Sequence, residues 1–148
     1  MSEISKLVSC AMADTSNVCD DVKLGRFPNF LAQSIAAKTG VRLHGVEIIL
    51  TAYSIRHIIK GHSVHTEELE KRGQIGVVNS DFDLIPEILQ KADFIIKGSI
   101  ERGKQSILFI KKIKCFYHVA MILEGKKDEV KLVLRTMYKS NVNKKADV

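Results

Sequence analysis

The chain of 148 residues lacks any apolar segment close to the roughly 18 to 20 residues that a membrane-spanning helix needs. Its first stretch, MSEISKLVSCAMADTSNVCDD, has an acidic residue at Glu3 and no apolar core of the kind found in signal peptides. The cysteines are few and widely spaced, at Cys10, Cys19 and Cys115, and no CxxC pair occurs. This argues against a disulfide framework and a zinc knuckle. We therefore expect a cytoplasmic protein without a transmembrane segment; delivery by a phage or a secretion machine is the alternative.

The composition is that of one globular domain with an excess of positive charge. Hydrophobic residues make up 45% of the chain and charged residues 27%, which is typical of a folded protein. The length is enough for one domain to bury its own core. Lys and Arg total 23 against 17 Asp and Glu, giving a net charge of +6. This charge is compatible with a polyanionic partner such as RNA, DNA or an anionic membrane.

The first half of the chain has the hydrophobic spacing of helices. The pattern predicts helices over 29–40, 51–61 and 79–93, with Pro86 dividing the last one, and a strand over 41–50. Residues 1–25 mix short apolar pieces with Ser, Asp and Asn, and we expect a poorly ordered arm or a short loose helix there.

The pattern changes in the second half of the chain, which is rich in strand-forming residues. Four β-rich runs are separated by short loops, which predicts an antiparallel meander; they cover 93–98, 105–113, 115–125 and 129–139. The expected fold is α+β, with the N-terminal helices packed on one face of a C-terminal four-stranded antiparallel sheet. One domain would span residues 26–140, followed by a frayed tail over 141–148.

The segment SIRHIIKGHSVH, residues 54–65, holds three of the five histidines. His57 and His62 are five residues apart, which turns their side chains about 140° away from each other on a helix. No carboxylate lies between them, unlike in the HExxH motif of zinc enzymes. His62 and His65 could share a metal in a loop, but no third ligand is obvious. We therefore expect no metal site.

Packing and acid–base chemistry remain as roles for these histidines. Ile55, Ile58, Ile59 and position 62 follow the spacing of an apolar stripe, on which His62 would be a core residue. Gly61 favours a helix stop that would release His62 into a loop. A histidine titrates near pH 6.5 and can both accept and donate a proton, as cleavage of an RNA strand requires.

A second polar group stands near the end of the chain, in LVLRTMYK. Alternation along a strand places Thr136 and Tyr138 on one face, and Arg135 precedes them. Ordinary β-propensity is the competing explanation for Thr and Tyr here. His44 and His118 have no predicted role beyond packing.

The order of these motifs resembles the phage-encoded branch of the Barnase–EndoU–colicin–RelE (BECR) nuclease superfamily. Such domains often occur at the C-terminus of phage head-morphogenesis proteins of the Mu F type. The resemblance covers roughly residues 41–140. It is carried by Ser54, Ile55-Arg56-His57, His62, Ile85-Pro86-Glu87-Ile88 and Thr136-Met137-Tyr138.

The resemblance implies an endoribonuclease that needs neither a metal nor another cofactor. RNA, including tRNA, would be the substrate, and a toxin or conflict role would imply an immunity protein or antitoxin as partner; no membrane is involved. Carried over residue by residue, the catalytic groups would be His57, His62, Thr136 and Tyr138, with Arg56 and Arg135 contacting phosphate. EndoU-like enzymes also use a lysine, and Lys97, Lys111 and Lys112 are equally eligible.

A non-catalytic domain that keeps this fold is the alternative. It would bind nucleic acid or serve as a phage structural module, and the basic charge fits it equally well. No glycine-rich or acidic arrangement favours a third chemistry, ADP-ribosyl transfer.

Overall fold

One mixed sheet organises the protein. The computed structural model describes residues 2–13, 18–62, 73–126 and 128–142. The six strands along the sheet are, in spatial order, β1 (Val22–Arg26), β2 (Glu47–Leu50), β7 (Lys131–Ser140), β6 (Cys115–Glu124), β5 (Lys104–Ile113) and β4 (Phe94–Glu101). A seventh, β3 (Gln74–Ile75), also pairs with β7.

The α+β class is confirmed, but the expectation of a four-stranded antiparallel sheet is wrong. The predicted meander is present as β4 to β7, joined by tight turns, including a two-residue turn at Arg102–Gly103 and the single residue Lys114. Three short strands then extend the sheet beyond β7, and β2 runs parallel to β7. These strands are too short to show a pattern of their own, and the predicted strand over 41–50 is reduced to its last four residues.

The helices follow the expected order, with an additional one at the N-terminus. They are α1 (Glu3–Met12), α2 (Asn29–Thr39), α3 (Ala52–His62), the 3-10 helix η1 (Asn79–Leu84) and α5 (Ile85–Gln90). Pro86 opens α5, which confirms the predicted division of the third helix. Gly61 does not end α3, because the helix continues to His62. Within the described ranges, no helix is long and apolar enough to cross a membrane.

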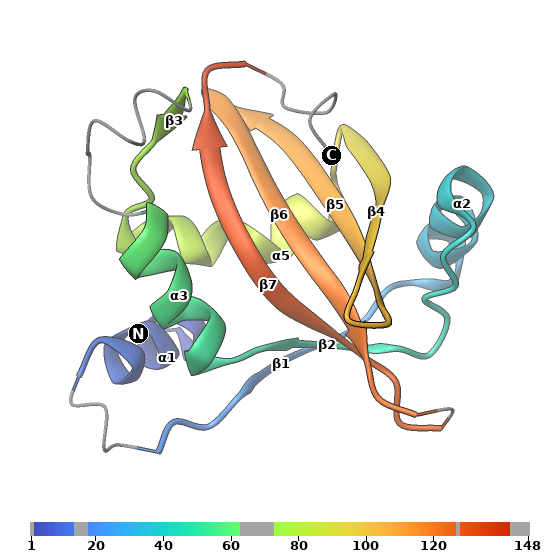
Figure 1. Ribbon diagram of the computed structural model, residues 1–148, viewed down its shortest axis with the longest axis horizontal. Helices are drawn as coiled ribbons and strands as arrows, with labels where there is room; N and C mark the ends of the chain where they lie inside the picture. Colours follow the sequence, from blue (N-terminus) through green and yellow to red (C-terminus); the bar gives the residue numbers. More distant parts are fainter. Residues whose placement is uncertain (1, 14–17, 63–72, 127, 143–148) are drawn as a thin grey trace.

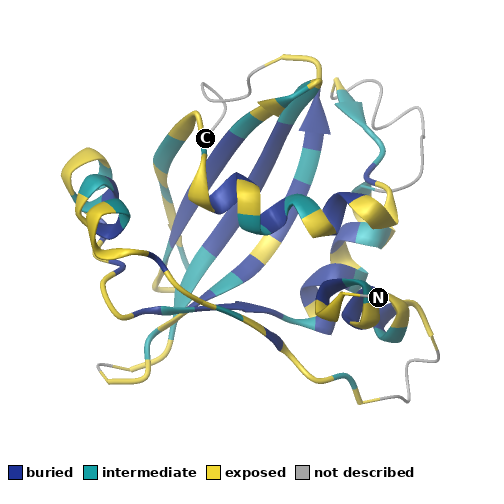
Figure 2. Cartoon of the chain, turned by 180° about the vertical axis from the view of Figure 1, so that it is seen from behind, coloured by how far each residue is buried: buried dark blue, intermediate teal, exposed yellow. Residues whose placement is uncertain are grey.

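Most of the hydrophobic core lies between the sheet and α1, α3, η1 and α5. Figure 1 shows α5 passing behind the strands, and Figure 2 shows the buried residues on that rear side. Fully buried sheet residues such as Phe109 and Val119 pack in one cluster with Ile55 and Phe82 from the helices. The opposite face carries only a small apolar cluster of Leu108, Ile110 and Ala120. That face is open toward the viewer in Figure 1.

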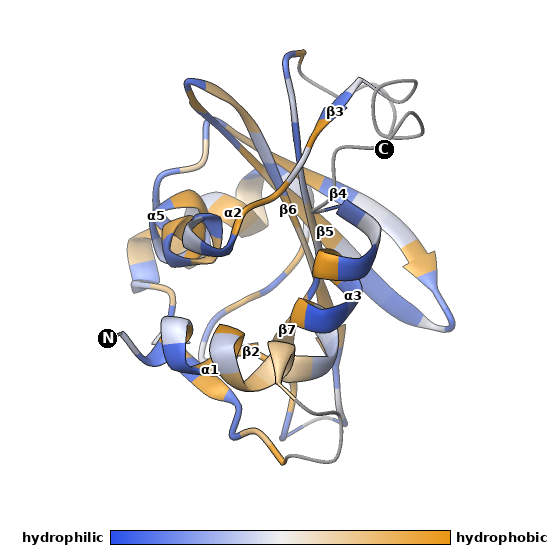
Figure 3. Ribbon diagram, turned by 90° about the vertical axis from the view of Figure 1, so that its left-hand side faces the viewer, coloured by the Kyte–Doolittle hydropathy of each residue, from blue (hydrophilic) through white to orange (hydrophobic). Residues whose placement is uncertain are grey.

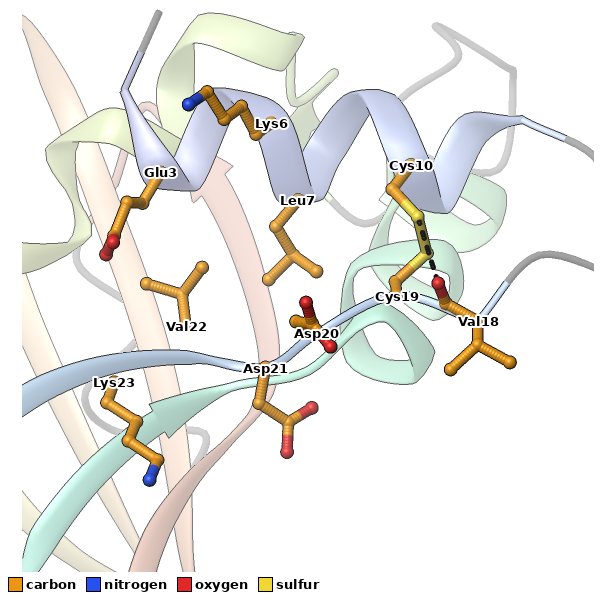
Figure 4. A pocket seen from close by; sticks show the side chains of 10 residues that line it. All are labelled: Glu3, Lys6, Leu7, Cys10, Val18, Cys19, Asp20, Asp21, Val22 and Lys23. Atoms are coloured by element: carbon orange, nitrogen blue, oxygen red, sulfur yellow. Dashed lines mark hydrogen bonds between the residues drawn. A yellow bond between two sulfur atoms is a disulfide. The ribbon is translucent and has the colours of Figure 1, made fainter.

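Of the two forms expected for the N-terminal segment, a poorly ordered arm or a short loose helix, the structure has a helix over Glu3–Met12. Helix α1 buries Ile4, Leu7 and Val8 in the main core, because its apolar residues recur at helical spacing. A disulfide joins Cys10 to Cys19 with a Cα–Cα distance of 5.9 Å, so the expectation of no disulfide is also wrong. Figure 4 shows the pocket between α1 and residues 18–23, with this disulfide at one end. The predicted frayed tail lies outside the described residues from position 143 onward.

A buried polar network fixes η1 to the ends of β6 and β7. The Asp81 carboxylate accepts from Lys139 Nζ, Tyr117 Oη and the Val78 N–H, each at 2.8 Å. Burial and the neighbouring Asp81 carboxylate raise the pKa of Tyr117 above its usual range, so this hydroxyl stays protonated and keeps donating. The network holds the segment that follows β3 against the sheet.

We expect the substitution Asp81→Ala to lower the free energy of unfolding by about 3–5 kcal/mol, because it leaves the Lys139 ammonium buried without its counter-charge. The two side chains are only 10% and 7% exposed, so water cannot replace the lost partner. Urea unfolding measures the change. Asp83→Ala is the matched control: Asp83 is exposed, accepts from Ser2 Oγ, and should cost at most about 1 kcal/mol. Equal losses in the two variants would contradict the role of the network.

Candidate active site

The outer edge of β7 is occupied at its two ends and open in the middle. Strand β2 pairs with residues 131–133, and β3 pairs with residues 139 and 140. Among the described strands, none pairs with β7 between these points on that edge. Helix α3, which connects β2 toward β3, lies alongside this gap (Figure 1). The topology therefore brings the histidine helix to the middle of the strand that carries Arg135, Thr136 and Tyr138.

Helix α3 is anchored to β7 near the helix N-terminus. Thr51 Oγ1 accepts from the Ser54 N–H at 3.2 Å and so caps the first turn of the helix. The Ser54 hydroxyl donates to the Leu134 carbonyl of β7 and so satisfies part of the open strand edge. Ile55 and Ile58 on the inner side of α3 are fully buried, whereas His57 is exposed. Figure 3 shows α3 carrying both hydrophobic and hydrophilic residues. The helix thus packs on one side and presents His57 on the other.

A β-bulge in β7 decides which side chains reach the open face. The register passes from Ala120↔Thr136 to Met121↔Leu134, so Arg135 is an extra residue in β7. Before the bulge Leu134 faces the core, and after it Met137 does. Strict alternation would have placed Thr136 with Leu134 on the core side. Because of the bulge, Arg135, Thr136 and Tyr138 all lie on the open face.

These residues and the histidines line one cleft, called here the α3–β7 cleft. Its volume is about 750 Å³, and the β4–β5 turn closes its far side. The sequence-predicted residues that line it are His57, His62, Arg135, Thr136 and Tyr138. Arg56 is not a cleft residue: its Nε donates to the Ala11 carbonyl at 3.0 Å, and its Nη2 contacts Cys19 Sγ. The structure therefore places Arg56 in the anchoring of the N-terminal segment rather than beside the other five.

The Tyr138 ring lies between two histidines. Its centroid is 6.0 Å from that of His62 and 4.5 Å from that of His118, with which it is nearly parallel at 8°. His62 Nδ1 lies 2.9 Å from Gln74 Oε1. An amide oxygen only accepts, so the hydrogen of this contact comes from His62 Nδ1. The Val77 N–H donates to the His62 carbonyl at 2.6 Å. These bonds set the position of His62.

The polar residues of β7 differ in how they are held. Arg135 forms a two-point ion pair with Glu101 of β4: Nη2 donates to Oε1 at 2.7 Å, and Nε lies 2.6 Å from Oε2. Thr136 is buried, yet its hydroxyl makes no hydrogen bond with any described residue. A buried hydroxyl without a partner costs free energy unless a ligand or water satisfies it. The cleft thus places one guanidinium next to a buried hydroxyl that has no hydrogen-bond partner among the described residues.

Sequence reasoning missed several residues of this site. His118 is fully buried under Tyr138, and only the β6–β7 register reveals that the two side chains are opposite each other. Gln74 and Glu101 come from β3 and β4, far from the motifs in sequence. Among the described residues, Lys104 is the lysine that lines the cleft. The three candidates from the sequence, Lys97, Lys111 and Lys112, do not line it. His65 lies outside the described residues. Within the described ranges, no group of three or more His, Cys, Asp or Glu side chains could hold a metal ion.

The chain matches the model of a protein family. The model of the family described as "phage-Barnase-EndoU-ColicinE5/D-RelE like nuclease3" matches residues 26–147. This range contains the whole α3–β7 cleft and excludes α1 and the disulfide. A search of curated proteins and a search of solved structures return no match.

Proposed function

Since the chain belongs to the phage-Barnase-EndoU-ColicinE5/D-RelE like nuclease family, we propose that it is an endoribonuclease acting by 2′-hydroxyl transesterification. The observation that carries the proposal is the meeting of α3 and β7. Two histidines, an arginine, a threonine and a tyrosine from segments about 75 residues apart in sequence line one cleft. A site of this composition can move protons and neutralise a phosphate without a bound metal.

The proposed reaction uses the two histidines as base and acid. One takes the proton of a ribose 2′-hydroxyl, whose oxygen attacks the adjacent phosphorus while the bond from phosphorus to the 5′-oxygen breaks. The other donates a proton to that leaving oxygen, which yields a 2′,3′-cyclic phosphate and a new 5′-hydroxyl. A proton on Nδ1, in contact with Gln74, would leave Nε2 as the accepting nitrogen of His62. Arg135 and the Thr136 hydroxyl would contact the phosphate oxygens as charge develops on them.

Incubation of the purified protein with total RNA or tRNA in excess EDTA tests this function. We expect discrete fragments that end in a 2′,3′-cyclic phosphate. Loss of cleavage on chelation would refute the metal-independent mechanism. Salt-dependent RNA binding without any cleavage would instead favour a non-catalytic binding domain.

The substitution Gln74→Glu should shift the pH dependence of cleavage. A carboxylate in place of the amide would lie close to His62 Nδ1 and favour the protonated imidazole, which raises the pKa of His62. The limb of the kcat/KM profile that depends on His62 should then move to higher pH. Gln33→Glu, at an exposed glutamine of α2 that does not line the cleft, serves as the control and should leave the limb in place. An unchanged limb in Gln74→Glu would contradict the assignment of His62.

The same proposal extends to a toxin role with a protein antagonist. Inducible expression in a bacterial host should stop growth and produce discrete cleavage of cellular RNA, and a variant lacking both His57 and His62 should do neither. An immunity protein or antitoxin would act by covering the α3–β7 cleft. The cleft is flanked by the exposed cations Arg102 and Lys104, which an acidic partner would match.

A further inference from the structure

A second cavity continues from the cleft along the open face of the sheet. This sheet-face cavity has a volume of about 220 Å³ and shares Glu101, Arg135, Thr136 and Tyr138 with the α3–β7 cleft. A ligand whose phosphate reaches Arg135 would therefore have an adjoining group at the mouth of this cavity. A role for the sheet-face cavity rests on the proposed function. The question is which part of the RNA enters this cavity.

The floor of the sheet-face cavity is apolar. Leu108 and Ala120 line it and are 4% and 8% exposed. They belong to the small cluster on the open face, apart from the main core. The floor carries no charged side chain, so it does not suit a phosphate, but it suits the flat, apolar face of an aromatic ring.

Polar groups surround this floor. The Ser106 hydroxyl donates to the Ser99 carbonyl at 2.7 Å and retains its capacity to accept a hydrogen bond. The buried Thr136 hydroxyl, which has no hydrogen-bond partner among the described residues, lies where the cavity meets the cleft. An apolar floor edged by hydroxyl groups complements a nucleobase, which has apolar faces and a polar edge.

A bulge in β4 builds the wall of this cavity. The register runs from Lys97↔Ile107 to Ile100↔Gln105, so β4 has one extra residue there. Gln105 Nε2 donates to the Gly98 carbonyl at 2.8 Å and holds the bulge in place. A Cβ on Gly98 would lie 2.2 Å from Ser106 Oγ, so any other residue would displace the rim hydroxyl. The wall thus depends on a glycine at this position.

We propose that the sheet-face cavity is a nucleobase subsite, which receives the base of a nucleotide next to the scissile phosphate. The base would lie on Leu108 and Ala120 with its edge toward Ser106. A base paired within a duplex cannot enter such a cavity, so the substrate is single-stranded or looped RNA.

Binding of an uncleavable RNA tests the subsite separately from catalysis. The probes are a short 2′-O-methyl oligonucleotide of each base and an abasic oligonucleotide of equal length and charge, followed by fluorescence anisotropy. Wild type should bind the preferred base about tenfold more tightly than the abasic probe. Ala120→Leu, which fills the cavity, should reduce this ratio to about twofold while leaving abasic binding unchanged. Ala37→Leu, on the exposed side of α2, is the matched control.

The outcomes separate this inference from the nuclease proposal. A wild-type protein that binds base and abasic probes equally, or an Ala120→Leu variant that keeps the full ratio, overturns the subsite. Base-dependent binding that Ala120→Leu abolishes supports it, even for a chain that cleaves no RNA. Thermal unfolding checks that Ala120→Leu is folded. Ser106→Ala is the second variant and should change which base binds best, by about threefold or more.

Discussion

Replacing His62 with alanine is expected to reduce kcat/KM on RNA by about 10²–10⁴-fold, the usual contribution of a positioned acid–base group. The geometry makes His62 the better defined of the two histidines. Its Nδ1 is held by Gln74, its ring lies beside Tyr138, and its carbonyl is bound by Val77. Alanine removes the proton acceptor but leaves the backbone bond to Val77, so the fold should be retained.

Rates of single-turnover cleavage at several pH values measure this effect. His57→Ala should show a loss of similar size, and the double variant should lose little more than the worse single one, because acid and base act in the same step. His44→Ala is the matched control, since His44 is an exposed histidine away from the cleft. Wild-type rates in His62→Ala, or full additivity in the double variant, would show that the two histidines are not an acid–base pair.

The long elements of this fold could be predicted from the sequence because each contains its own pattern. The strands β5, β6 and β7 are ten residues each and are long runs rich in strand-forming residues, and the inner side of α3 shows a full apolar stripe. Strands β2 and β3 have four and two residues and form only because β7 offers them an edge. Such pairing is a tertiary effect that no local pattern records. The apolar residues of α1 recur at helical spacing, but where this helix packs depends on its contacts with α3 and η1.

The sequence indicated which segments form the site better than it indicated which side chains line the cleft. Arg56 and His57 are adjacent in sequence, yet consecutive residues of a helix point about 100° apart, so only His57 lines the cleft. The bulge at Arg135 reverses the alternation of β7 and could not be foreseen from the strand itself. Glu101 and His118 belong to other strands, and their proximity to the motifs follows from the curvature and register of the sheet. The catalytic roles of all these residues stay predictions.

Replacing Arg135 with alanine is expected to reduce kcat/KM by about 10²–10³-fold, the usual cost of removing one group that stabilises developing charge. The guanidinium already holds a carboxylate by two parallel contacts, and a phosphate presents its oxygens in the same way. RNA would therefore displace Glu101 from Arg135. Arg135→Lys should recover only part of the activity, because an ammonium lacks the forked geometry.

The substitution Glu101→Gln changes the other member of the ion pair and tests the same role of Arg135. An amide competes less well than a carboxylate for the guanidinium, so the phosphate should bind more easily and KM should fall while Arg135→Ala raises it. Arg42→Ala is the matched control, because Arg42 is exposed and does not line the cleft. Steady-state kinetics on one RNA at fixed ionic strength measures all four variants. If Arg135→Ala cleaves as fast as wild type, or if Glu101→Gln raises KM as much as Arg135→Ala does, then the ion pair serves only to hold β4 over the sheet.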